Sequence, residues 1–389
     1  ERILEVKKAS RSYQDSPARM QAIDTPATPP STADSVTASG GAPRRPILSS
    51  GVTDRTRHYG QFYGLLPLPG STDAAGTSNA TSTATARPRV VVVGNCQAES
   101  LRIVLNSSEP IDSFRIPPIH EWTQEDMPFV HHALRWANVL VSQPVRDNYR
   151  GLPCGTAQLE KMLRAQNMDN EGEAQVIRFP VLRFSALNPT WVIVRSPADT
   201  SLNPPVVPYH DITILAELGG LTRVNPADYP GILDLNVKQM GERERAHGTV
   251  IMSDYLRTCP TWHTLNHPDN ATLERLGVQV QQAIAKRRIE WAHLAEPSDQ
   301  VSAPMDREML GHLREPVDTA AWETLVPNNP QVPADRDSWT LHGRPLDPEE
   351  IAFAHRRFYT DHPEFVTSAM TRHATLLRLL GYQHEGARA

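Results

Sequence analysis

A run of four valines that ends in a glycine turn constrains the fold of this chain more than any other feature. Val90–Val93 is β-branched throughout, which is typical of a strand buried on both faces. The next residues, Gly94–Gln97, lead into apolar residues at helical spacing over positions 98–105. The sequence therefore predicts a buried strand, a tight turn and a helix, and it places Cys96 at the turn.

This turn gives Cys96 a position in which thiol chemistry is favourable. Open α/β sheets bind ligands at the carboxyl edge of their strands, where unpaired N–H groups of a first helical turn stabilise a thiolate or an oxyanion. We therefore predict that Cys96 is a nucleophile and that Gly94 belongs to the cofactor-binding turn. Asn95 and Gln97 are predicted amide donors to an oxyanion or substrate. The alternative for Cys96 is a small buried side chain, the usual state of a free cysteine.

Two more short strands and a series of helices follow the turn. Apolar runs over 136–141 and 175–179 predict strands, and helical segments such as 156–165 and 212–218 alternate with extended ones. This alternation predicts an α/β fold with a small parallel sheet whose active-site edge carries the strand-turn-helix unit. The second half is predicted to be rich in helices, at residues 230–240, 269–288, 348–359 and 363–380.

Composition divides the chain into three parts. Residues 1–87 are rich in Pro, Ser, Thr and Ala, and we predict that this tract is disordered, because it cannot bury enough apolar area to offset its ordering entropy. Within it, the aromatic segment 55–66 could either dock on the folded domain or form an unanchored linker. Residues 88–290 are predicted to form the catalytic domain, and residues 291–389 a loop-rich segment with a C-terminal helical extension.

Charge and cysteine content exclude several classes of protein. A formal net charge of −5 gives no basic field that would attract nucleic acid, so we expect no nucleic-acid partner. Three widely spaced cysteines cannot build a disulfide scaffold and favour a reducing compartment. We find no apolar leader in the first residues and no stretch of about 18 apolar residues, so we predict a cytoplasmic protein without a membrane span.

Two histidines lie close together in segment 259–270, just before a predicted helix. His263 and His267 are candidate bases, because an imidazole titrates near neutrality, and Asn266 could orient the base or contact substrate. Cys259 and both histidines could also bind zinc, but prolines at 260 and 268 disfavour one helix presenting all three, and we expect no metal. Alternatively, the segment has only a structural role, as a loop that is held in place by the N-cap residue of the following helix.

Further polar candidates follow other predicted strands or precede helices. Gln143 comes directly after the second strand and is a candidate oxyanion or substrate ligand. His210 either lines the site or lies in a loop, and Asp211 is the expected cap of the next helix. Arg146 and Arg150 could bind cofactor phosphates, although solvated surface arginines are the alternative. The glycine fingerprints of dinucleotide-binding proteins, nucleotide triphosphatases and serine hydrolases do not occur.

As a set, these residues resemble WcbI-type proteins, which are regarded as acetyltransferases of capsular polysaccharide biosynthesis. The resemblance covers roughly residues 89–287 and is carried, in chain order, by Gly94-Asn95-Cys96-Gln97, Ser142-Gln143, Tyr209-His210-Asp211, Arg243-Glu244, Ser253-Asp254 and His263-Thr264-Leu265-Asn266-His267-Pro268. It implies a coenzyme A-binding enzyme that transfers an acetyl group to a sugar hydroxyl, with Cys96 and a histidine of the last motif in its site.

The resulting prediction is an acetyl-coenzyme A-dependent O-acetyltransferase that acts on a polysaccharide or sugar precursor. Transfer could pass through a thioester on Cys96 or run directly, with Cys96 and Asn95 only polarising the carbonyl. A thiol-dependent acyl hydrolase would use the same residues, with water in place of the sugar. A carbohydrate-binding protein without catalytic activity is the non-enzymatic alternative.

Overall fold

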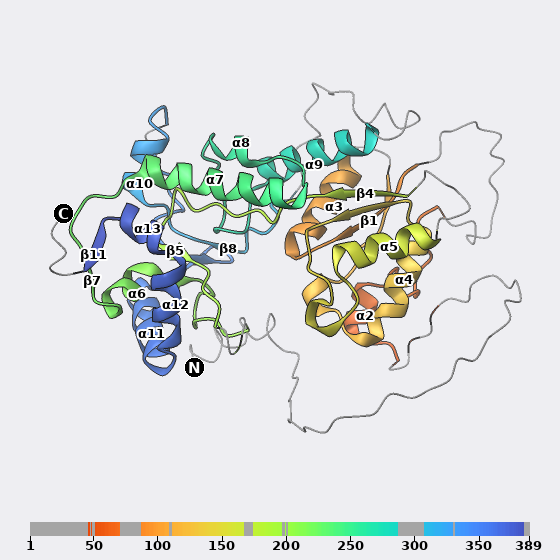
Figure 1. The fold of residues 1–389 in the computed structure, drawn as a ribbon, viewed down its shortest axis with the longest axis horizontal. Helices are drawn as coiled ribbons and strands as arrows, with labels where there is room; N and C mark the ends of the chain where they lie inside the picture. Colours follow the sequence, from red (N-terminus) through yellow and green to blue (C-terminus); the bar gives the residue numbers. More distant parts are fainter. Residues whose placement is uncertain are drawn as a thin grey trace, which may run out of the picture.

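The computed structural model describes residues 46, 48, 51–70, 87–108, 111–166, 174–196, 199, 201–286, 307–329 and 331–384. Its elements gather in two groups, one around a parallel sheet and one that is mostly helical (Figure 1). Helices α7 (Tyr229–His247) and α9 (Asn270–Ala285) lie along the top of the view, and α9 approaches the sheet group (Figure 1).

The sheet group is built on four parallel strands in the order β2, β1, β3, β4. These strands are β1 (Arg89–Val93), β2 (Asp112–Ser113), β3 (Val139–Ser142) and β4 (Gln175–Arg178). Val93 pairs with Ser142, and Ser142 pairs with Arg178, so the strands end in register at one edge. The α/β fold with a small parallel sheet is thus confirmed, and the residues after β1 and β3 emerge side by side.

Alternating valines of β1 pack into two separate apolar layers, as the pleat of a strand requires. Val90 and Val92 join a core with α9 and with α3 (Cys96–Ser108), which directly follows the turn. Val91 and Val93 face the second core, which contains α4 (Met127–Trp136) and α5 (Thr156–Gln166). Both faces of the sheet are therefore covered, which explains why the strand sequences are continuously apolar.

Most elements after β4 belong to the helical group, whereas α9 packs on α3. The group contains α6 (Ile212–Leu218), α7, α8 (Ser253–Leu256), α10 (Thr319–Leu325), α11 (Pro348–Asp361), α12 (Glu364–Arg372) and α13 (Ala374–Leu379). Short antiparallel pairs lie between them, namely β5 (Trp191–Val192) with β6 (His210–Asp211), β7 (Leu221–Arg223) with β11 (Tyr382–His384), and β8 (Leu313–Arg314) with β9 (Thr340–Leu341) and β10 (Arg344–Pro345). Helices α11 and α12 pack on α6, and α13 packs on α7. The predicted division of the chain at about residue 290 stays a prediction.

The N-terminal tract contains one ordered segment, which corrects the prediction of disorder for those residues. Helix α2 (Asp54–His58) precedes Phe62 and Tyr63, and both aromatic side chains are buried in the core around α4. Arg55 forms an ion pair with Asp126 at 3.1 Å, and the Tyr63 hydroxyl donates to the same carboxylate at 2.7 Å. Segment 55–66 therefore docks, whereas most of residues 1–87 lie outside the described part of the chain.

Two predicted helix boundaries are wrong. Helix α7 continues past Gly241 to His247, because its C-terminal half is held by Glu244, which accepts hydrogen bonds from the N–H groups of Met252 and Ser253. The predicted helix 363–380 is divided at His373 into α12 and α13. Among the described residues, no helix is both long and apolar enough to cross a membrane.

Candidate functional site

The turn between β1 and α3 is closed by a side chain from the end of β3. The Oε1 atom of Gln143 accepts a hydrogen bond from the N–H of Asn95 at 2.9 Å. A Cβ atom on Gly94 would lie 2.6 Å from the same oxygen, so a glycine is needed where Gln143 crosses the turn. The side-chain oxygen of Asn95 accepts from the N–H of Gln97 at 3.0 Å, which caps helix α3.

The side chain of Gln97 is buried and connects three parts of the chain. Its Nε2 donates to the carbonyl of Leu182 at 3.0 Å and to the carbonyl of Asn266 at 2.8 Å. Its Oε1 accepts from the N–H of Leu182 and from Nε2 of Gln143, both at 3.0 Å. All the hydrogen-bonding capacity that Gln97 could offer to an oxyanion is therefore used within the protein, and Gln97 acts as a connector.

The segment with the predicted base folds as a tight turn against this connector. Thr264 and His267 form an isolated antiparallel bridge, in which the N–H of His267 donates to the carbonyl of Thr264 at 3.0 Å. The hydroxyl of Tyr209 donates to Oδ1 of Asn266 at 2.7 Å and fixes that amide. Since Gln97 binds Asn266, the residue after Cys96 is hydrogen-bonded to the residue before His267. The structure thus brings together two motifs that are about 170 residues apart, as their residue numbers give.

Burial controls the protonation of Cys96. It raises the pKa of the thiol to about 11, although the N–H groups of Cys96 and Gln97 lower it. The sequence predicted that these N–H groups would favour the thiolate, and they do point to the sulfur, but desolvation is the larger effect. Cys96 is therefore a neutral thiol in the free protein, and it still retains partial solvent exposure.

The two candidate bases are both buried and differ in their neighbours. The pKa of His267 is lowered to about 3, mainly by burial and also by the nearby His312 and His263. The His312 ring lies 5.5 Å from that of His267, centroid to centroid. His263 faces a carboxylate, with its Nε2 3.7 Å from Glu308, and burial also lowers its pKa. Both imidazoles are therefore uncharged at neutral pH in the free protein.

His210 lies within the helical group, away from the connector contacts. It is buried between Tyr359 and Phe365, with ring centroids 5.7 Å and 4.8 Å away, and its Nδ1 is 3.2 Å from the Tyr359 hydroxyl. The preceding residue, Tyr209, is the one that contacts Asn266. Asp211 caps α6 as predicted, with Oδ1 accepting from the N–H of Thr213 at 2.8 Å.

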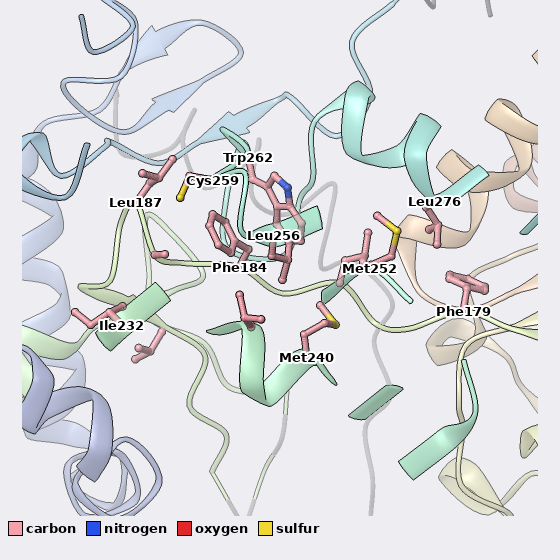
Figure 2. Close-up of a cluster of buried hydrophobic side chains, with 14 of the residues drawn as sticks. Phe179, Phe184, Leu187, Ile232, Met240, Met252, Leu256, Cys259, Trp262 and Leu276 are labelled. Atoms are coloured by element: carbon pink, nitrogen blue, oxygen red, sulfur yellow. The ribbon is translucent and has the colours of Figure 1, made fainter. Parts of the chain in front are cut away.

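The predicted phosphate ligands Arg146 and Arg150 and the alternative zinc ligand Cys259 lie in different surroundings. Arg146 and Arg150 are exposed in the segment after β3, and the charge of Arg150 helps to lower the pKa of His120, after burial. Figure 2 shows Cys259 beside Leu187, Phe184 and other apolar side chains. Within the described ranges, no three His, Cys, Asp or Glu side chains are arranged to hold a metal ion.

Sequence reasoning assigned no role to three residues that contribute to this site. Leu182 binds Gln97 through its backbone N–H and carbonyl, and the residue type at position 182 does not predict such a contact. Tyr209 directly precedes β6, and its partner Asn266 is 57 positions away in sequence, so no local pattern predicts their contact. His312 lies far from the histidine segment along the chain, and only the fold places its ring near His267.

The sequence and the fold of this chain were compared with those of known proteins. The sequence model of the family described as "Polysaccharide biosynthesis enzyme WcbI" matches residues 89–287, which is 199 of 389 residues. No curated protein matches the sequence. A solved structure of WcbI, a polysaccharide biosynthesis enzyme in a native form without a disulfide bond between coenzyme A and one of its cysteines, has the same fold with a TM-score of 0.57. It is 15% identical, and the alignment covers 76% of this chain and 98% of the other.

Proposed function

This chain belongs to the WcbI family of polysaccharide biosynthesis enzymes, and we propose that it is an acetyl-coenzyme A-dependent O-acetyltransferase with Cys96 and His267 in its site. The observation that carries the proposal is the hydrogen bond from Gln97 to the carbonyl of Asn266, which holds the thiol turn and the histidine turn together. The acceptor would be a hydroxyl of a capsular polysaccharide or of a sugar precursor in the cytoplasm.

In the free protein the proton between the two groups stays on sulfur, because the pKa of Cys96 is raised to about 11 and that of His267 is lowered to about 3. Transfer of this proton from Cys96 to His267 therefore requires bound reactants that bring the two pKa values toward each other. The thiolate attacks the acetyl carbonyl, and the departing thiolate of coenzyme A takes up the proton. A sugar hydroxyl then attacks the thioester on Cys96, gives its proton to His267 and releases the Cys96 thiolate.

Oxyanion stabilisation is the second requirement of this reaction. The N–H groups of Cys96 and Gln97 at the start of α3 favour negative charge at the Cys96 sulfur, although that of Gln97 also donates to the side chain of Asn95. The side chains of Gln97 and Gln143 position that turn instead of binding the oxyanion directly, because their amides already pair with Asn95, Leu182 and Asn266. In the alternative direct route, the same N–H groups polarise the acetyl carbonyl while the sugar hydroxyl attacks it.

The test combines calorimetric titration with product analysis. We expect the wild-type protein to bind coenzyme A and acetyl-coenzyme A and to acetylate a sugar acceptor. Cys96→Ala should reduce transfer at least about a hundredfold by removing the nucleophile, while Cys154→Ala, a buried thiol packed in the core around α4 and α5, should retain it. Absence of binding to either ligand would contradict the proposal. Release of free acetate at the same rate with and without sugar would identify a hydrolase instead.

A further inference from the structure

The N-terminal segment that docks on the sheet group is connected to the Cys96 turn by an intervening loop. We call residues 53–66 the docked segment and residues 115–122, which lie between β2 and α4, the bridging loop. In this loop the N–H of Ile119 donates to the carbonyl of Gly94 at 2.9 Å. The bridging loop is therefore hydrogen-bonded directly to the turn that carries Cys96.

A charged contact from the docked segment holds the end of the bridging loop. Both terminal nitrogens of Arg55 donate to the carboxylate of Asp126, at 3.1 and 3.2 Å, and one of them also donates to the carbonyl of Glu121 at 3.3 Å. The hydroxyl of Tyr63 donates to the same carboxylate at 2.7 Å. Asp126 is buried, and a bidentate arginine pair of this kind is stronger than a single neutral hydrogen bond. Arg55 thus restrains the loop two residues from Ile119.

Apolar packing connects the docked segment to the loop and to the strand before the turn. Phe62 and Trp122 line one small internal cavity together with Val93, and all three side chains are buried. The indole N–H of Trp122 donates to the carbonyl of Pro117 at 2.8 Å, which closes the bridging loop on itself. Since Val93 directly precedes Gly94, the docked segment packs against both partners of the hydrogen bond that joins loop and turn.

A third contact leads from the docked segment to helix α3. The guanidinium group of Arg115 lies 5.4 Å from the centre of the Tyr59 ring, and its Nε lies 3.6 Å from Oε1 of Glu99. Glu99 belongs to the first turn of α3, three residues after Cys96. The docked segment is therefore linked through single residues to elements on both sides of the thiol.

We propose that the docked segment positions the proposed site, with Arg55 and Tyr63 as positioning residues that keep the Cys96 turn closed through the bridging loop. The segment precedes residues 89–287, so part of the support of the site lies outside the region that the family model matches. The Cys96 thiol is only partly exposed, and opening of the turn would increase its contact with solvent. The inference rests on the proposed function only in giving Cys96 a reactive role.

The experiment measures alkylation of the folded full-length chain by iodoacetamide at pH 8, followed by mass spectrometry of each cysteine peptide. In Arg55→Gln, Cys96 should react roughly fivefold to tenfold faster than in wild type, because opening of the turn no longer breaks a charge-assisted contact. Tyr63→Phe keeps the ring, loses one hydrogen bond and should accelerate the reaction about threefold. The matched control is Arg57→Gln in the same helix, which removes an exposed arginine paired with Asp54 at 3.2 Å and should react as wild type does.

The other two cysteines separate a local effect from general loosening. Cys154 is buried in the same apolar core as Tyr63, and Cys259 is buried in the other core. Both should keep their wild-type rates in all variants. Equal acceleration of Cys96 and Cys154 would mean that the docked segment only stabilises the core, and it would overturn the inference. An unchanged Cys96 rate in both Arg55→Gln and Tyr63→Phe would overturn it as well.

Enzyme kinetics give a second readout of positioning. We expect Arg55→Gln to lower kcat for acetyl transfer several-fold, because the reacting thiol is held less precisely. Arg55→Lys keeps the charge, and it should recover part of both the wild-type kcat and the slow alkylation. A wild-type protein that transfers no acetyl group would contradict the proposed function, and the alkylation rates alone would then still decide this inference.

Discussion

At the scale of single residues, the Cys96 thiol shows two opposing effects on one pKa. The N–H groups at the start of α3 favour the thiolate, and burial favours the thiol more strongly, so that the pKa is raised to about 11. A nucleophile held in its neutral form is protected from oxidation and alkylation between turnovers, because only the thiolate reacts quickly. Activation then depends on a base and on bound reactants.

This balance predicts slow alkylation of Cys96 in the free protein. A rise of about two units in the thiol pKa lowers the thiolate fraction at pH 8 roughly a hundredfold, so iodoacetamide should modify Cys96 about that much more slowly than the same cysteine in denaturant. Mass spectrometry of the Cys96 peptide across pH 7–11 measures the rate. A rate that levels off at or below pH 9 would show that the helix N-terminus dominates and that burial does not.

At the scale of elements, the β1–α3 turn depends on the contact between Gly94 and Gln143. Gly94→Ala would bring a methyl group within 2.6 Å of the Gln143 oxygen and break its hydrogen bond to Asn95. We expect a loss of about 2 kcal/mol in the free energy of unfolding, together with reduced transfer, because the same turn carries Cys96. Urea denaturation and turnover measure the two effects.

The matched control for this substitution lies in the interior of α7. At Gly241, an added Cβ would meet the flexible end of Arg245 at 3.2 Å, and its next neighbour is the Ser253 hydroxyl at 3.6 Å. Gly241→Ala should therefore raise stability by about 0.5–1 kcal/mol, as alanine does in a helix. Similar losses in both variants would mean that the Gly94 contact has no special role.

The elements that were easiest to predict from sequence are the strands that are buried on both faces. The valines of β1 and β3 are covered on both faces, and the sequence predicted a strand at each place. Helix α7 was predicted too short, because Gly241 lowers local helix propensity and only the contact of Glu244 with Ser253 shows why the helix continues. Whether a segment forms a helix or a strand thus follows from its local sequence pattern. Where the helix or strand ends depends on tertiary contacts.

The candidate site could be predicted only in part for the same reason. Cys96 and His267 were identified from their residue types, because a thiol can act as a nucleophile and an imidazole as a base. The roles of Gln97 and Tyr209 depend on partners about 57 to 169 positions away in sequence, so no local signal distinguishes a connector from an oxyanion donor. For His210, the residue type suggested the site, and the aromatic neighbours on α11 and α12 place it in the core.

At the scale of the whole molecule, one apolar core joins the two groups of elements. It includes Val92 of β1, Leu276 of α9, Met240 of α7 and Phe365 of α12, and Figure 2 shows part of this continuous packing. The C-terminal helices therefore complete the environment of residues that precede them, such as His210. The solved WcbI structure aligns over 76% of this chain, a larger share than the 199 residues that the family model matches.

Burial of neutral imidazoles in this core predicts a steep dependence of stability on pH. The pKa of His210 and of His267 is lowered to about 3, and that of His355 to about 4, with desolvation as the main cause. In the unfolded chain all three take up protons near pH 6.5, so their contribution is fully present above that pH and is lost as the pH falls toward 4. Three protons correspond to about 4 kcal/mol per pH unit in this window.

The substitution His355→Phe isolates one of these three protons. It removes a titrating group that packs against Trp191 and Tyr359, and phenylalanine keeps an aromatic ring there. Urea denaturation at pH 7, 6 and 5 should show a mean slope smaller by about 1 kcal/mol per pH unit than that of wild type, whatever the change in absolute stability. Substitution of the exposed His247 by Gln controls for loss of an imidazole at the surface. An unchanged slope in the His355 variant would mean that this imidazole is already protonated in the folded protein, which its burial among aromatic rings argues against.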